Sequence, residues 1–138
     1  MELNYVAIVV ATVLQFIFGW AWYMPLFGKA WGAMHGFDRL SKVEQERAQK
    51  EMRPQLVAQF VGTLVTTFVL ALFISELSSE WHAFGAAGFM WLGFVLPTQV
   101  SAVMFGGTPK EWMCKKIAIM AGGSLACYMI AATVLYFF

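Results

Sequence analysis

The stretch that decides the fold is PQLVAQFVGTLVTTFVLALFIS, residues 54–75, which contains no Asp, Glu, Lys or Arg. As an α-helix it is long enough to cross a hydrocarbon core of about 30 Å. Residues 3–28, 81–109 and 117–138 are equally free of these charged residues. Backbone groups in lipid must be paired within their own segment, and no segment alternates like a barrel strand. The sequence therefore predicts an all-α polytopic membrane protein with four transmembrane helices in a bundle.

The composition supports a single membrane domain. Hydrophobic residues make up 60% of the 138 residues and charged residues 12%, whereas an average soluble domain has about 25% charged residues. Because so few charges cannot cover a soluble surface, we expect the lipid bilayer to be the main partner. The net charge of +1 predicts no binding to nucleic acid. We expect one domain, residues 1–138, with helices at about 3–27, 54–76, 82–105 and 113–137.

The basic residues predict the orientation. All nine Lys and Arg residues lie within residues 29–53 or 110–116. Since cytoplasmic loops are enriched in Lys and Arg, both segments are expected in the cytoplasm and both termini outside. The first apolar stretch has no basic region before it and no small-residue cleavage site, so we expect it to stay in the membrane.

A short cytoplasmic helix is predicted between the first two spans, at about residues 41–52. Ser41 and Glu44 have the spacing of a capping box, and Pro54 suits the first turn of the following helix. This helix is interpreted as a solvated spacer, with docking to a partner or to the membrane surface as the alternative.

Uncharged polar residues within the spans form the candidate site. No charged residue lies in the middle of a span, which weighs against ion-coupled transport through buried carboxylates. We expect Gln59 and Gln99, at similar depth, to face each other or a shared cavity. They act there either as structural hydrogen-bonding groups or as the lining of a wet pathway. The whole predicted polar cluster is Gln15, Gln59, Thr63, Thr66 and Gln99.

Small residues at helical spacing predict the packing faces, because they let helix backbones approach closely. On the second span the face that carries Gln59 is expected to face other helices, with Leu64 and Phe68 opposite, toward lipid. The predicted packing residues are Gly19, Gly62, Gly85, Gly88, Gly122 and Ala126.

Pro97 predicts a kink in the third span, because proline cannot donate the backbone hydrogen bond of that turn. Thr98 and Ser101 are the residues expected to satisfy the freed carbonyl groups. No catalytic pair, phosphate loop or metal-ligand spacing is present in the sequence. His35 and His82 are placed at opposite membrane faces, so neither a metal site nor a cofactor is predicted.

Two segments carry a family resemblance. Residues 22–31 read WYMPLFGKAW, and residues 93–98 read GFVLPT, with Phe105 and Pro109-Lys110 after them. With these motifs the chain resembles the small bacterial four-helix membrane-protein family catalogued as domain of unknown function 1761. The resemblance implies four helices and a charged loop after the first. It also implies an Asp or Asn in the fourth helix, where this chain has Met120.

Two functions are expected from these observations. The first is a non-catalytic bundle that acts by assembly, as a homo-oligomer or as an accessory subunit of a larger membrane complex. The alternative is a small pore or transporter for water or a small neutral solute, along a pathway lined by glutamine and threonine. An enzyme acting on lipid ranks last, because no nucleophile or acid–base pair is visible.

Overall fold

The computed structural model describes residues 2–77 and 82–138, and their regular structure is all helical. Four helical stretches are long and apolar enough to cross a membrane. Residues 78–81, in the connection expected outside the membrane, lie outside the described residues. The four stretches are Tyr5–Leu26, Lys42–Glu76, Ala83–Phe105 and Lys110–Phe137.

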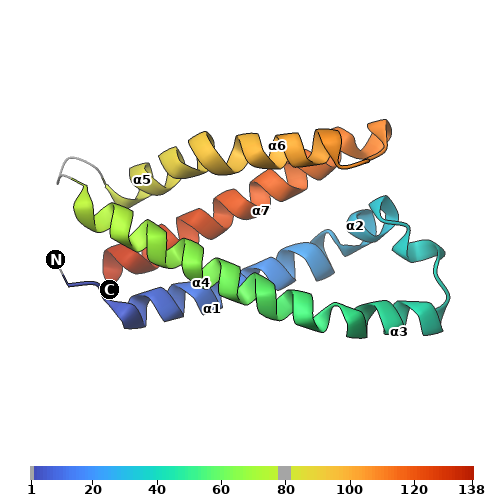
Figure 1. The fold of residues 1–138 in the computed structure, drawn as a ribbon, viewed down its shortest axis with the longest axis horizontal. Coiled ribbons are helices and arrows are strands. Elements are labelled where there is room, and N and C mark those ends of the chain that lie inside the picture. The colour runs from blue at the N-terminus through green and yellow to red at the C-terminus, as the bar shows by residue number, and fades with distance from the viewer. Residues whose placement is uncertain (1, 78–81) are drawn as a thin grey trace.

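Each stretch is built from labelled elements (Figure 1). The first consists of α1 (Tyr5–Ala21) and a π-helical turn, η1 (Trp22–Leu26), followed by α2 (Gly28–Met34) and a short 3₁₀ turn, η2 (Phe37–Arg39). The second joins α3 (Lys42–Glu51) to α4 (Arg53–Glu76). The third contains α5 (Ala83–Met90), a second π-helical turn, η3 (Trp91–Val95), and α6 (Leu96–Phe105), and the fourth is α7 (Lys110–Phe137).

Local sequence explains where α3 begins. The Ser41 backbone N–H donates to the Glu44 carboxylate at 2.9 Å, and the Glu44 N–H donates to the Ser41 hydroxyl at 3.3 Å. This reciprocal pair is the predicted capping box, which is confirmed. Pro54 lies in the first turn of α4, where a missing backbone N–H costs nothing.

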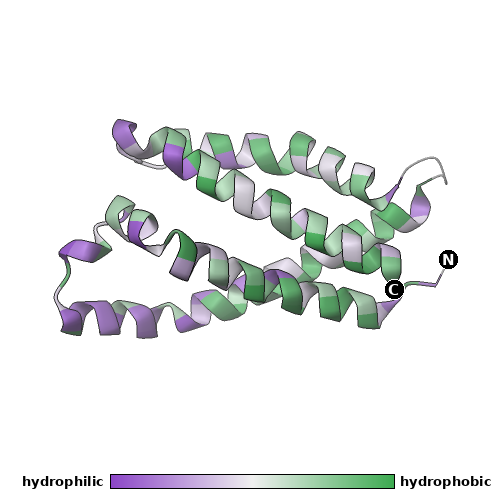
Figure 2. Ribbon diagram, turned by 180° about the vertical axis from the view of Figure 1, so that it is seen from behind, coloured by the Kyte–Doolittle hydropathy of each residue, from purple (hydrophilic) through white to green (hydrophobic). Residues whose placement is uncertain are grey.

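The helices are arranged around α7. Helix α7 packs against α1, α5 and α6, whereas α4 packs mainly on α1 and makes a smaller contact with α5. Figure 1 shows the ribbons of α4 and α6 diverging toward the end that carries α3. Figure 2 shows hydrophilic residues gathered toward the two ends and apolar residues between them. Small side chains dominate the buried core: Ala7, Ala11, Ala83, Ala87, Ala131 and Ala132 all lie in it.

Helix α1 turns a face of small and polar residues inward. Ala11, Thr12 and Gln15 are buried, whereas Val13 and Ile17 are exposed. The rotation of α4 differs from the prediction. Its buried residues are Thr67, Leu70 and Ala71, and Phe60 packs edge-on against Phe16 of α1 with ring centroids 5.4 Å apart.

The predicted packing face of the second span is therefore not the face that packs within the protomer. Gln59, Gly62 and Thr66 are exposed, whereas Leu64 and Phe68, expected toward lipid, are half-buried. The physical reason is that aromatic stacking and the buried threonine decide the contact with α1, so small size alone does not identify the packing face.

Pro25 and Pro97 both accompany π-helical turns. Pro25 lies within η1, and Pro97 follows η3 at the start of α6. The hydroxyl of Thr98 donates to the Phe94 carbonyl at 2.6 Å and not to the Gly93 carbonyl, four residues before Pro97, so it does not supply the predicted compensation. Among the described residues no hydrogen bond from Ser101 contributes to this compensation.

Candidate functional site

Gln15 joins α1 to α4 through a buried hydrogen bond. Its amide nitrogen donates to the Thr67 hydroxyl at 2.8 Å and to the Ala11 carbonyl at 3.1 Å. The Thr67 hydroxyl in turn donates to the Thr63 carbonyl at 2.8 Å. Both amide protons of Gln15 are therefore used within the protomer. The helix contact of this glutamine is structural, and Thr67, which carries it, was not among the predicted site residues.

Gln59 lies on the exposed side of α4. Its amide nitrogen is 3.5 Å from the Thr63 hydroxyl on the same helix, at the outer limit of a hydrogen bond. The Thr63 and Thr66 hydroxyls donate to the carbonyls of Gln59 and Gly62, each at 2.9 Å. The two threonines are satisfied by their own helix, whereas the Gln59 amide has only this weak contact.

Gln99 belongs to a different group. The Trp91 indole N–H donates to the Ser124 hydroxyl at 2.8 Å. That hydroxyl lies 3.0 Å from the Gln99 side-chain oxygen and 3.1 Å from the Ala121 carbonyl, which share its single proton. This group ties the third helical stretch to α7, and its central residue, Ser124, was not predicted from the sequence.

The structure does not bring the predicted polar cluster together. Gln15 bonds to α4, Gln59 contacts only its own helix, and Gln99 bonds to Ser124 of α7. The expected pairing of Gln59 with Gln99 is therefore replaced by separate partners. The reason is that α4 packs on α1 and diverges from α6 (Figure 1), so a matched depth along the helices does not produce proximity.

The closest helix contact surrounds Trp22. Its indole N–H donates to the Ile119 carbonyl of α7 at 2.9 Å. The ring lies over Gly122 and Gly123, where added Cβ atoms would meet ring atoms at 3.2 Å and 2.8 Å. Gly122 was predicted as a packing residue and Gly123 was not. The two adjacent glycines were the available sequence signal for this contact.

The other small residues predicted for packing have looser surroundings. A Cβ at Gly88 would lie 3.8 Å from the Met129 side chain, whereas a Cβ at Gly19 or Gly62 would meet nothing within 4 Å. Gly85 is exposed and Ala126 is half-buried. Among these predicted packing glycines, Gly122 has the least room for a side chain, as does its neighbour Gly123.

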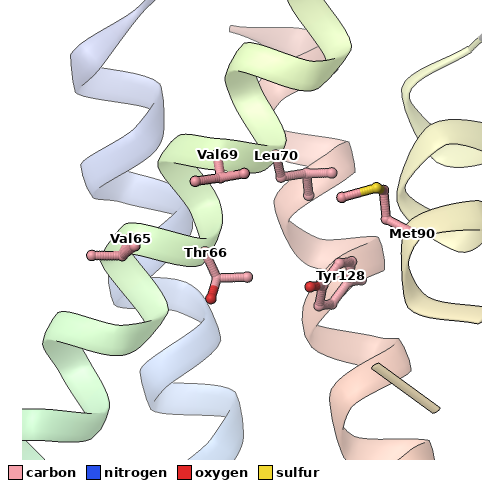
Figure 3. Close-up of a pocket in the computed structure, with 6 residues that line it drawn as sticks. All are labelled: Val65, Thr66, Val69, Leu70, Met90 and Tyr128. Atoms are coloured by element: carbon pink, nitrogen blue, oxygen red, sulfur yellow. The ribbon is translucent and has the colours of Figure 1, made fainter. Parts of the chain in front are cut away.

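A groove of about 230 Å³ lies between α4, α5 and α7 (Figure 3). Val65, Val69, Leu70 and Met90 form its apolar walls, and Thr66 and Tyr128 also line it. Figure 3 shows the Tyr128 ring extending from α7 toward α4, with its hydroxyl on the side that faces α4. This groove was not predicted, because its walls come from three separate helices.

Polar contacts also join α2 to α7. The Lys116 ammonium lies 3.2 Å from His35 Nε2 and 5.6 Å above the Trp31 ring. His35 Nδ1 lies 2.8 Å from the Trp31 carbonyl. A carbonyl only accepts, so Nδ1 is the protonated nitrogen and Nε2 accepts from Lys116. Within residues 2–77 and 82–138, no group of three His, Cys, Asp or Glu side chains is arranged to hold a metal ion.

Comparison with known proteins places the chain in a family. The model of the family described as "Protein of unknown function (DUF1761)" matches residues 6–136, nearly the whole chain. No curated protein and no solved structure matches the chain. The matched range includes both π-helical turns, the Trp22 contact and the groove. The chain belongs to the DUF1761 family of proteins of unknown function.

Proposed function

We propose that this chain is a polytopic protein of the bacterial inner membrane, with its four long helices in a transmembrane bundle. Both termini lie outside, and α3 is a cytoplasmic helix. The support for this orientation is that every Lys and Arg lies within residues 29–53 or 110–116. Hydrophilic residues at both ends of the long helices (Figure 2) agree with a span between two aqueous boundaries.

The protein acts by assembly with other membrane helices and not by catalysis. The observation that carries this proposal is the exposed polar face of α4. Four residues of this face, Gln55, Gln59, Gly62 and Thr66, are exposed in the protomer. Hydrocarbon offers the Gln59 amide neither donors nor acceptors, so an unpaired amide there costs free energy. A helix from another chain supplies the missing hydrogen bonds.

The shape of this face suits a neighbouring helix. A Cβ at Gly62 would meet nothing within 4 Å, so a partner backbone can approach there. Gln59 lies about 9 Å above the start of α4 at Arg53, within the inner half of the span. In a symmetric dimer the same glutamine of a second copy is available as a partner, because an amide both donates and accepts.

The alternative of a glutamine-lined pore has less support. Gln15 and Gln59 bond to threonines of α4, whereas Gln99 bonds to Ser124 of α7. Both amide protons of Gln15 are already donated to protein groups. A continuous row of free amides is what a wet pathway of this kind requires.

The test is the substitution Gly62→Leu. Because position 62 has free space in the protomer, leucine leaves the melting temperature of the protomer unchanged but blocks a partner helix, and we expect association to weaken about tenfold. Ile17→Leu, on the exposed face of α1, is the control and leaves association unchanged. Light scattering of the purified protein in mild detergent measures its mass.

Two outcomes separate the forms of assembly. A purified protein heavier than one chain indicates a homo-oligomer. A monomer after purification that migrates as a larger complex in native membranes indicates an accessory subunit. A monomeric mass in both preparations, or association unaffected by Gly62→Leu, contradicts the proposal.

A further inference from the structure

The groove between α4, α5 and α7 combines apolar walls with two hydroxyl groups. Its walls are Val65, Val69, Leu70 and Met90, and the hydroxyls belong to Thr66 and Tyr128. Thr66 lies about 20 Å along α4 from Arg53, and Tyr128 about 18 Å along α7 from Lys116. Both hydroxyls are therefore near the middle of their spans, far from either aqueous boundary.

The two hydroxyls differ in what they offer a ligand. The Thr66 hydroxyl donates its proton to the Gly62 carbonyl at 2.9 Å, so only its lone pairs remain available. Among the described residues, the Tyr128 hydroxyl has no hydrogen-bond partner. A phenol proton facing hydrocarbon without an acceptor is unfavourable. Acyl chains at this depth contain no acceptor, and Tyr128 and Thr66 are not hydrogen-bonded to each other, so the phenol proton is available to a ligand.

We propose that this groove binds an apolar, membrane-dissolved molecule that carries a carbonyl group, with Tyr128 donating to the carbonyl oxygen. The apolar walls contact the hydrocarbon part of the ligand, and the single donor fixes its orientation. Small-molecule sites are usually built in this way, from an apolar lining and a few polar groups. The groove is about 230 Å³, which suits a molecule of one or two rings. The groove shares Thr66 with the α4 face proposed for assembly, but the binding itself does not require assembly.

The experiment uses 2-acetylnaphthalene and 2-isopropenylnaphthalene, which have nearly the same shape but differ by a carbonyl oxygen in place of a methylene group. Saturable binding to the purified full chain in detergent is measured by equilibrium dialysis against protein-free micelles. We expect the wild-type protein to bind the ketone about tenfold more tightly than the hydrocarbon. Tyr128→Phe keeps the ring but removes the donor, so this preference is lost.

Two further variants locate the site. Tyr136→Phe makes the same chemical change at an exposed tyrosine of α7 and keeps the tenfold preference. Met90→Trp fills the groove and weakens the binding of both compounds. Thermal unfolding of each variant confirms that it is folded before its affinity is compared.

The outcomes that overturn this proposal are specific. Equal affinity of the wild-type protein for the two compounds shows that the Tyr128 hydroxyl does not recognise a carbonyl. A ketone preference that survives Tyr128→Phe places the recognition elsewhere. The absence of saturable binding, as when an acyl chain or a second copy fills the groove, also overturns it.

Discussion

The indole ring of Trp22 lies directly over Gly123 of α7, so that a Cβ added to Gly123 would be 2.8 Å from the indole nitrogen. The same nitrogen donates to the Ile119 carbonyl one turn earlier in α7, at 2.9 Å. Glycine at position 123 is therefore required for the hydrogen bond as well as for the packing. The contact links the π-helical turn η1 to the central helix and holds the first and last spans together.

Gly123→Ala is expected to destabilise the fold. The new methyl group forces Trp22 away from α7 and weakens its bond to Ile119, at a cost of about 1–3 kcal/mol. Thermal unfolding in detergent measures the loss. Gly19→Ala is the control, because a Cβ there meets nothing within 4 Å and alanine favours a helix by about 0.5–1 kcal/mol. Equal melting temperatures for the two variants contradict this account of the contact.

Gln15 and Thr67 are expected to be energetically coupled. Gln15→Leu and Thr67→Val each remove the 2.8 Å bond between α1 and α4 and should each lower stability by about 1 kcal/mol. The double variant should lose less than the sum, with a coupling of about 0.6 kcal/mol, as is typical of interhelical bonds in membranes. A double-mutant cycle by unfolding in detergent measures the coupling. Additive losses mean that the bond does not contribute.

Ser124→Ala should separate the third helical stretch from α7. It leaves the Trp91 N–H and the Gln99 oxygen without the hydroxyl that they share, and unpaired groups of this kind cost about 1–3 kcal/mol. Thermal unfolding of the purified protein in detergent measures the loss. Ser101→Ala, at an exposed position of α6, is the matched control with no expected change. Comparable destabilisation by both alanines argues against this group.

The proposed orientation predicts which cysteines react from outside intact cells. Cys114 is exposed near the start of α7, beside the basic residues expected in the cytoplasm, so an impermeant maleimide should not label it. Leu77→Cys in a Cys114→Ser background, at the opposite end of α4, should be labelled. All variants carry Cys127→Ala to remove the second thiol. Labelling of Cys114 before the cells are opened reverses the orientation.

Features formed by residues close together in the chain could be predicted from the sequence. The length of the four segments without charged residues predicted the four helices that are long enough to span a membrane. The Ser41–Glu44 spacing predicted the capping box. These features depend on helix rise, hydrophobicity and hydrogen bonds over a few residues, which the order of residues itself defines.

The candidate site could be predicted only in part, because its partners come from different helices. The sequence singled out Gln15, Gln59 and Gln99 as polar residues within the spans, but their depths did not reveal their partners. Thr67 and Ser124 became their partners through the rotation of α4 and the position of α7. Periodicity cannot fix such rotations when most faces of a helix are apolar.

The sequence by itself predicted that the protein has an apolar exterior, because too few charges are available to cover a soluble surface. It also determined the number and length of the long helices. Only the tertiary structure decided that α7 is central, that Trp22 lies over Gly123, and that α4 leaves Gln59 exposed. The physical reason is that burial in lipid depends on the composition of each segment. Helix pairing, in contrast, depends on side-chain shape and on hydrogen bonds between segments far apart in the chain.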